Sequence, residues 1–386
     1  MLSALVLGLY ITAVLCDSET VLVLGGQGLA GSATLTALLE SNFQVSALND
    51  DRNFYDYHEL FHDKIESIVC VRPAGLDGCF ELQNFLKTNQ NKVKAIVDFT
   101  SSSKELMEEA VRILAPLNPE VYIFVSAAAV YDVSDNPKQP LKESDAVRPE
   151  DPTLRAQYSE TNEFGHKMLG SEEALVASGL PYVILRCGDL IGPRDTTYRW
   201  WQYQVWSEHF DIIQAAFPVP GEFEHLTFSL TYGADLAAAV VSVINKRVIN
   251  EVYNIAMEKT FTLPHYLLEL CIYFGNGESC WADYSATIQS YSLYPSNHMG
   301  LMSTEHAKVD LDFQPSSWED VLRDTVTYYE KARHNHTKER DIVLSKLNEN
   351  VVPYLRVEKL NEAVLKPAEK VVDITSSRPE VNKIEL

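Results

Sequence analysis

The sequence predicts an α/β fold in which a doubly wound parallel sheet is followed by a small mixed C-terminal subdomain. Short apolar runs alternate with helical stretches as far as residue 192, and a glycine-rich turn joins the first run to the first helix. Beyond Pro193 this alternation stops, and segments rich in aromatic residues and proline replace it. Strand–helix alternation places helices on both faces of a parallel sheet, and we expect the later part to lie over the carboxyl edge of that sheet.

The expected elements follow in chain order. Runs rich in Val, Ile and Leu predict strands at residues 20–26, 43–48, 65–71, 93–99, 121–127 and 179–192. Helical stretches are predicted at residues 31–42, 104–117, 160–178, 233–246, 263–274 and 317–332. The chain is therefore expected to have four parts, which are a leader (1–16), a sheet domain completed by later segments (17–192), a subdomain with closing helices (193–333) and a charged extension (334–386).

The composition limits the classes of partner. The 386 residues include 54 acidic and 32 basic side chains, which gives a formal net charge of −22. Such a chain repels phosphate backbones, so broad affinity for nucleic acid is excluded unless a local basic patch exists. We interpret the excess carboxylates as a solvated surface.

The two ends of the chain predict a compartment. Residues 1–16 form an uncharged apolar run that suits a signal peptide, to be cleaved after Cys16, better than a membrane span. The alternative is a buried first strand, but a separate strand begins directly afterwards. The last four residues read KIEL, similar to the retention address of the endoplasmic reticulum, and Asn335-His336-Thr337 is a glycosylation sequon. We expect a glycoprotein of the secretory pathway, either luminal in the endoplasmic reticulum or secreted.

The cysteines fit this compartment without fixing a pairing. Five remain after removal of the leader: Cys70, Cys79, Cys187, Cys271 and Cys280. Two pairs are nine residues apart, and both could close short loops in an oxidising lumen. Buried free thiols are the alternative, and the spacing suits no metal site.

The glycine-rich turn predicts a dinucleotide site. Gly25, Gly28 and Gly31 follow at three-residue spacing between a strand and a helix, and Leu29 stands at the start of that helix. The first glycine permits a tight turn, the second lets backbone amides approach a pyrophosphate, and the third lets helix and strand pack closely. This arrangement is typical of a Rossmann NAD(P)-binding domain.

The end of the second strand bears on the choice of cofactor. Asn49 stands where a carboxylate would bond the adenosine ribose, and Asp50 follows it. Arg52 would instead suit a 2′-phosphate. The residues leave NAD and NADP open and favour NAD.

The motifs together resemble the extended short-chain dehydrogenase/reductase family, which includes NAD-dependent epimerases and dehydratases. The resemblance covers roughly residues 20–330 and includes the glycine turn, VYIFVSAAAVYD, LPYVILRCGDLIGPRD and SLTYGADLAAAVVSVI. It implies a nucleotide-sugar-like or other small-molecule ligand at the carboxyl edge of the sheet, and homodimers through a helix pair.

The family's catalytic groups are altered in this chain. In the family a tyrosine is the acid/base, a lysine four residues later lowers its pKa and holds the nicotinamide ribose, and a serine or threonine assists. Alignment on Val130-Tyr131 puts Ala127 at the hydroxyl position, while Ser126 is expected on the opposite face of the sheet. Lys167 matches the lysine, and Glu163 replaces the tyrosine.

Lys167 and Glu163 are therefore the candidate catalytic residues, with Lys167 also expected to bind the cofactor. Glu163 would need strong desolvation to act as an acid near neutrality, and its other interpretation is a solvated carboxylate. Tyr158 lies nine residues before Lys167 and on the wrong helix face. His166 is an alternative proton donor.

A narrower resemblance concerns the chloroplast stem-loop-binding branch, which shares the fold, lacks the tyrosine and has plant members that bind and cut RNA. It is carried by ETNEFGHKMLGSEEAL and RCGDLIGPRDTTYRWWQYQ, among other stretches, and reaches to about residue 350. Few basic residues accompany the aromatics of the second stretch, so core packing is their expected use.

Three hypotheses follow. The first is an NAD(P)-binding protein of the epimerase/dehydratase type that lacks the standard acid/base groups. The second is an active epimerase, dehydratase or reductase with relocated groups, and the third is an RNA-binding protein or ribonuclease.

Overall fold

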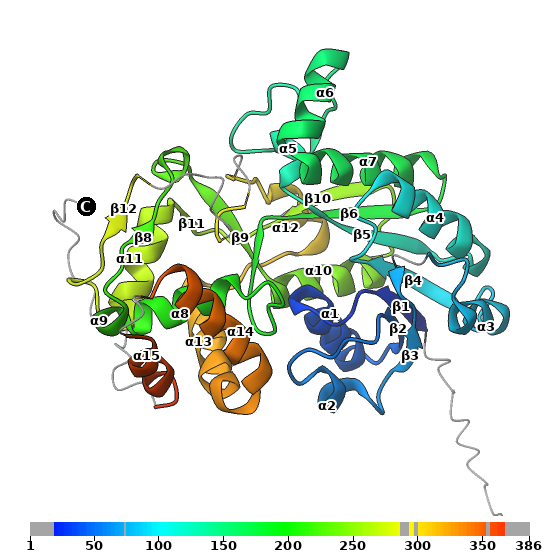
Figure 1. The fold of residues 1–386 in the computed structure, drawn as a ribbon. Helices are drawn as coiled ribbons and strands as arrows, with labels where there is room; N and C mark the ends of the chain where they lie inside the picture. Colours follow the sequence, from blue (N-terminus) through cyan, green and yellow to red (C-terminus); the bar gives the residue numbers. More distant parts are fainter. Residues whose placement is uncertain (1–18, 73–74, 286–292, 297–299, 353–355, 367–386) are drawn as a thin grey trace, which may run out of the picture.

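The computed structural model of the protein describes residues 19–366, apart from residues 73–74, 286–292, 297–299 and 353–355 (Figure 1). The predicted signal peptide and the KIEL terminus lie outside the described residues. No described helix combines the length and the apolar character that crossing a membrane requires.

A seven-stranded parallel sheet forms the centre of the larger part, in the order β10–β6–β5–β4–β1–β2–β3. Its strands are β1 (Thr20–Leu24), β2 (Gln44–Asn49), β3 (Glu66–Val69), β4 (Val93–Asp98), β5 (Val121–Ala127), β6 (Tyr182–Cys187) and β10 (Glu251–Ile255). The order reverses between β1 and β4, and ligands of open α/β sheets bind at such a switch point beyond the carboxyl ends of the strands. The predicted doubly wound α/β fold is thus confirmed.

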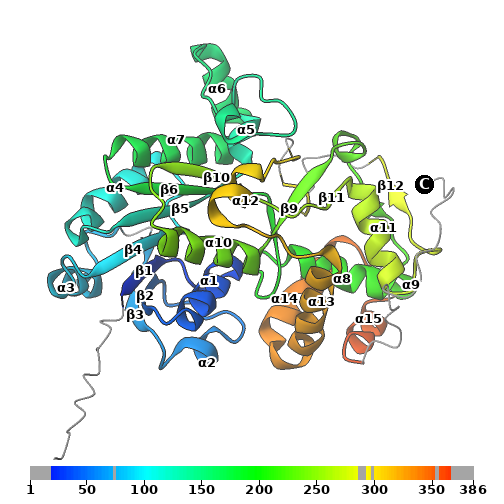
Figure 2. The ribbon, with the colours of Figure 1, turned by 180° about the vertical axis from the view of Figure 1, so that it is seen from behind.

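Helices cover both faces of the sheet, as Figures 1 and 2 show. One face packs against α1 (Leu29–Glu40), α2 (Tyr57–Phe61), α10 (Gly233–Lys246) and α12 (Glu305–Leu311). The other packs against α3 (Phe80–Thr88), α4 (Lys104–Leu114) and α7 (Glu163–Ala177). Two shorter helices, α5 (Ala129–Asp132) and α6 (Pro152–Thr161), precede α7, and α6 projects from the body in both views.

Periodicity explains how these helices face the sheet. In α10 the apolar residues Leu236, Val240 and Val243 recur at helical spacing and are all buried. Both faces of the sheet are covered, so strands such as β1 and β5 are apolar along most of their length rather than alternating.

The smaller part holds two short sheets and six helices within the described residues. The sheets are β11–β9–β7 and β12–β8, formed by β7 (Asp189–Ile191), β8 (Phe217–Pro218), β9 (Phe228–Tyr232), β11 (Thr260–Phe261) and β12 (Ala282–Asp283). The helices are α8 (Arg199–Glu208), α9 (Phe210–Ile213), α11 (Leu263–Tyr273), α13 (Trp318–Asn335), α14 (Thr337–Asn350) and α15 (Val357–Ala363). This is the predicted mixed subdomain.

The C-terminal helices pack more closely than a charged extension would. Val343 and Leu347 of α14 are almost fully buried in the same core as Trp201 of α8 and Tyr329 of α13. The described part of the segment that we expected to be an extension therefore belongs to the core of the smaller part, because its apolar residues form a stripe among the charges.

Two disulfides close the nine-residue spacings. Cys70 is bonded to Cys79, and Cys271 to Cys280, whereas Cys187 is a buried free thiol. The two pairings that the sequence left open are thereby assigned.

Candidate cofactor site

The glycine turn between β1 and α1 has the backbone geometry that a dinucleotide requires. Gly25 has φ +89°, a conformation that favours glycine, and its N–H donates to the carbonyl of Leu48 at the end of β2 (2.9 Å). A Cβ on Gly31 would lie 2.2 Å from the carbonyl oxygen of Gly25, so only glycine lets α1 approach the turn. A Cβ on Gly28 would meet only the Thr196 hydroxyl oxygen, at 3.5 Å. The turn is therefore tightly packed behind Gly31 and open in front of Gly28.

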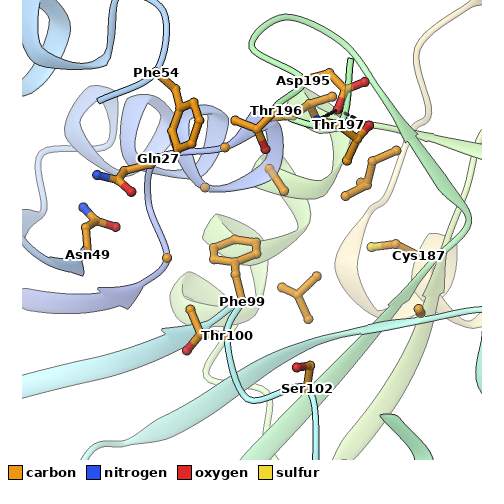
Figure 3. Close-up of a pocket in the computed structure, with 18 of the residues that line it drawn as sticks. Gln27, Asn49, Phe54, Phe99, Thr100, Ser102, Cys187, Asp195, Thr196 and Thr197 are labelled. Carbon is orange, nitrogen blue, oxygen red and sulfur yellow. Dashed lines mark hydrogen bonds between the residues drawn. The ribbon is translucent and has the colours of Figure 1, made fainter. Parts of the chain in front are cut away.

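The cavity beside this turn has a volume of about 840 Å³ and extends along the carboxyl ends of the strands. Figure 3 shows Gln27, Asn49 and Phe54 at one end, and Cys187 at the other. The amino terminus of α1, which begins at Leu29, opens into it. Since helix amino termini favour anions, this is the position that a pyrophosphate would take.

Asn49, the last residue of β2, and the residues that follow it line one end of the cavity. The side-chain oxygen of Asn49 accepts the Gly26 N–H (2.6 Å), and its amide nitrogen donates to the Tyr57 hydroxyl (2.6 Å). Asn49 thus fixes the glycine turn. Asp50 is paired with Arg52 (2.6 Å), whose side chain is 68% exposed at the rim. The ribose contact expected of Asp50 stays a prediction, and its carboxylate lines the cavity.

The far wall of this end comes from the segment after β3. Cys70 and Arg72 both line the cavity. Arg72 donates to Glu109 (2.8 Å) and Ser101 (2.9 Å), and the Cys70–Cys79 disulfide closes the loop that carries it. Neither residue was predicted from the sequence to line a ligand site. The spacing of Cys70 to Cys79 indicated a possible disulfide, and no sequence pattern indicated a role for Arg72.

At the other end, α7 turns an apolar face to the cavity. Phe164 and Met168, four residues apart, line it together with Ala127 at the end of β5. Glu163 and Lys167 form an ion pair with each other instead, and their side chains are 67% and 50% exposed.

The predicted catalytic residues Glu163 and Lys167 are not among the residues that line the cavity. Successive helix residues point about 100° apart, so a sequence match shifted by one changes the face. The pair with tyrosine–lysine spacing that faces the cavity is Phe164 and Met168, not Glu163 and Lys167. In the sequence, the apolar residues Phe164 and Met168 are four apart and each follows one residue of the charged pair, and this pattern could have indicated which face of α7 borders the cavity.

Ser126, near the end of β5, is also among the residues that line the cavity. Its hydroxyl donates to Glu172 (2.6 Å), which also pairs with Arg186 of β6 (2.7 Å). His166 contacts Arg148 (3.1 Å) and is not part of the cavity wall. Burial, and then the charge of Arg148, lower the pKa of His166.

Two further polar residues that line the cavity are Cys187 and Asp195. Burial raises the pKa of the Cys187 thiol to about 12, so the thiol stays protonated near neutrality. The Asp195 carboxylate is occupied by the Thr197 N–H (2.8 Å), its hydroxyl (2.6 Å) and the Arg199 N–H (3.0 Å). The described lining contains no histidine, lysine or glutamate. The lining does hold hydroxyl groups, among them those of Tyr198 and Ser126.

The aromatic stretch after Pro193 is core, as expected. Trp200, Trp201, Tyr203 and Trp206 are at most 3% exposed and pack in the smaller part. Only Tyr198 of the five aromatic residues lines the cavity. Among the described residues no cluster of metal-ligating side chains is found.

Comparison with known proteins identifies the family. Residues 21–256 match the sequence model of the NAD dependent epimerase/dehydratase family. The chain belongs to this family. The predicted relationship to epimerases and dehydratases is confirmed, and so is the NAD-type cofactor as a property of the family. Comparison with curated proteins gave no significant match.

Solved structures show the same fold. UDP-glucose 4-epimerase from Thermotoga maritima, solved with UDP-glucose, is 17% identical with a TM-score of 0.62, over 82% of this chain and 100% of that one. UDP-glucuronic acid 4-epimerase from Bacillus cereus, in complex with UDP-glucuronic acid and NAD, is 16% identical with a TM-score of 0.61, over 81% and 99%. dTDP-glucose 4,6-dehydratase from Bacillus anthracis, in complex with NAD, is 17% identical with a TM-score of 0.62, over 81% and 97%.

Proposed function

We propose that this protein binds NAD(H) in the cavity but does not carry out the proton-coupled chemistry of its family. The observation that carries the proposal is the pairing of an intact glycine turn with an apolar α7 face made by Phe164 and Met168. A nicotinamide supplies or accepts hydride when bound. The accompanying proton needs an acid or base within hydrogen-bond reach, and a benzyl ring, a thioether and the methyl of Ala127 cannot provide one.

A nucleotide-sugar-like or other small metabolite is the proposed second ligand. The turn at residues 195–199 of the smaller part also lines the cavity, so a second ligand that contacts this turn would lie close to the dinucleotide. The similar epimerases of Thermotoga maritima and Bacillus cereus were solved with UDP-glucose and UDP-glucuronic acid, which suggests the class to try first.

The test is a fluorescence titration of the full chain with NADH and NADPH, together with a turnover screen of nucleotide sugars. We expect saturable dinucleotide binding, tighter for NADH, and no epimerisation or dehydration. Lys167→Met should change NADH affinity less than about twofold, because Lys167 faces solvent, whereas Met168→Glu should weaken binding by placing a charge against the nicotinamide end. Absence of binding would refute the proposal, and turnover would favour the alternative of an active enzyme with relocated groups.

We further propose that the protein is a glycoprotein of the secretory pathway, luminal in the endoplasmic reticulum or secreted. Support comes from the apolar leader, the KIEL end, the two disulfides and the exposure of Asn335 and Thr337 at the corner between α13 and α14. Oxidising compartments favour such disulfides, and glycosylation needs an exposed sequon.

Expression of the full chain in secretory cells tests this. We expect a glycosidase to reduce its mass by one glycan, Thr337→Ala to abolish that shift, and Thr337→Ser to keep it, since serine also completes a sequon. Recovery of the protein in the cytosol would contradict the location. A luminal protein without a mass shift would contradict only the glycan.

A further inference from the structure

Two segments far apart in the sequence meet beside the glycine turn. The Tyr55 hydroxyl donates to the backbone carbonyl of Asp195 (2.8 Å). The Arg194 guanidinium donates twice to the Asp56 carboxylate (2.6 and 2.8 Å). Figure 3 shows Phe54, next to Tyr55, and Thr196, next to Asp195, on the same side of the turn. We call the contact of these two segments the Tyr55–Asp195 bridge.

The C-terminal helices hold both sides of the bridge. Tyr329 of α13 accepts the Asp195 N–H through its hydroxyl oxygen (2.9 Å). Glu339 of α14, only 4% exposed, accepts the Tyr55 N–H (3.1 Å). Tyr328 packs against the Tyr55 ring (centroids 5.9 Å apart). Each contact comes from outside residues 21–256, the part matched by the family model.

The backbone at the bridge supports a constrained arrangement. Tyr55, Arg194 and Tyr198 have φ of +52°, +66° and +62°. Side-chain-bearing residues rarely adopt this region, and they remain in it only where the surroundings hold them. Tyr55 is 6% exposed, enclosed by aromatic rings of α8 and α13. The bridge is therefore a packed contact and not a chance approach of two loops.

The bridge adjoins the part of the cavity next to Gly28. Phe54, Asp195 and Thr196 line the cavity, and a Cβ on Gly28 would lie 3.5 Å from the Thr196 hydroxyl oxygen. A dinucleotide with its pyrophosphate at the amino terminus of α1 would therefore contact this segment. A segment that is held in place there would slow the release of the dinucleotide.

We propose that the Tyr55–Asp195 bridge retains the bound dinucleotide, and that Glu339 is a positioning residue that keeps the bridge closed. This inference rests on the proposed function, since it needs a dinucleotide in the cavity. Beyond the proposed function, it says that bound dinucleotide exchanges slowly with dinucleotide in solution. It also attributes this slow exchange to the helices α13 and α14, which lie outside the segment matched by the family model.

The test measures the release rate of NADH from the full chain by stopped-flow chase with excess NAD⁺. Tyr55→Phe removes only the hydroxyl and leaves the Asp195 carbonyl without that donor, so release should accelerate about tenfold. Glu339→Ala should accelerate it similarly. Glu339→Gln is the matched control, because its amide oxygen can still accept the Tyr55 N–H, and the rate should stay within about twofold of wild type.

Two further readouts separate the possible failures. Thermal unfolding of each variant shows whether a faster release rate reflects general destabilisation. If Tyr55→Phe and Glu339→Ala remain folded and release NADH at the wild-type rate, the inference is overturned and the proposed function is left intact. Hydrogen exchange of the Tyr55 and Asp195 amides in the ligand-free protein reports the bridge itself, and rapid exchange of both in wild type would also overturn it. Failure of NADH to bind would instead refute the proposed function.

Discussion

Gly28 and Gly31 belong to one motif but meet different constraints. Gly31 is packed against the backbone of Gly25 and Gly26, where a Cβ would approach to 2.2 and 2.7 Å. Gly28 has φ −87°, which any residue can adopt, and a Cβ there would have room in the ligand-free protein. Gly31 is therefore needed by the fold, and Gly28 is needed for binding of the ligand.

Alanine substitutions should separate these roles. We expect Gly31→Ala to lower the free energy of unfolding by about 1–3 kcal/mol, because backbone must move, and to weaken NADH binding as well. Gly28→Ala should change the free energy of unfolding by less than about 1 kcal/mol but abolish measurable NADH binding, since its methyl occupies the approach of the pyrophosphate. Urea unfolding and NADH titration of both variants provide the check. Equal stability losses would contradict the distinction.

At the scale of elements, α7 carries two ion pairs in opposite environments. Glu172 and Arg186 are 5% exposed each, and the carboxylate of Glu172 also accepts the Ser126 hydroxyl. Glu163 and Lys167 are largely exposed. A buried charge that loses its partner has no solvent to compensate it, whereas an exposed charge is hydrated.

Removal of one partner from each pair should therefore have unequal effects. Glu172→Gln leaves the Arg186 charge buried between α7 and β6 and should cost about 3–5 kcal/mol of unfolding free energy. Lys167→Gln should cost less than about 1 kcal/mol. Chemical unfolding of the two variants at neutral pH measures both values, and comparable losses would contradict the expected difference between the buried and the exposed pair.

For α7, the sequence predicted the position of the helix but not which of its residues line the cavity. The strand–helix alternation placed α7 and β5 correctly, because apolar periodicity depends on neighbouring residues only. The match of Lys167 to a family position was one residue from the cavity-facing Met168. Spacing alone cannot predict which face of a helix points toward the sheet, because residues four apart share a face whichever residue the pair begins at. In α7 the rotation is set by the close packing of Gly165 against the Ala129 backbone.

At the scale of the whole molecule, the sequence predicted the sheet, the glycine turn and the aromatic core, all of which depend on local pattern. It did not predict the bridge, because Tyr55 meets Asp195 and Glu339 across separations of 140 and 284 residues. Nor did the charged composition of residues 337–350 reveal that α14 would enter the core. Contacts of this range follow from the assembled fold and not from any single segment.

The placement of the bridge also has a consequence for how relatives are compared. The family-matched segment, residues 21–256, contains the glycine turn, while Tyr329 and Glu339, which bond the two sides of the bridge, lie beyond it. Two relatives can therefore agree throughout that segment and still differ in how long they keep the same dinucleotide. Within such a family, residence time would diversify through the C-terminal helices while the recognition motif stays unchanged.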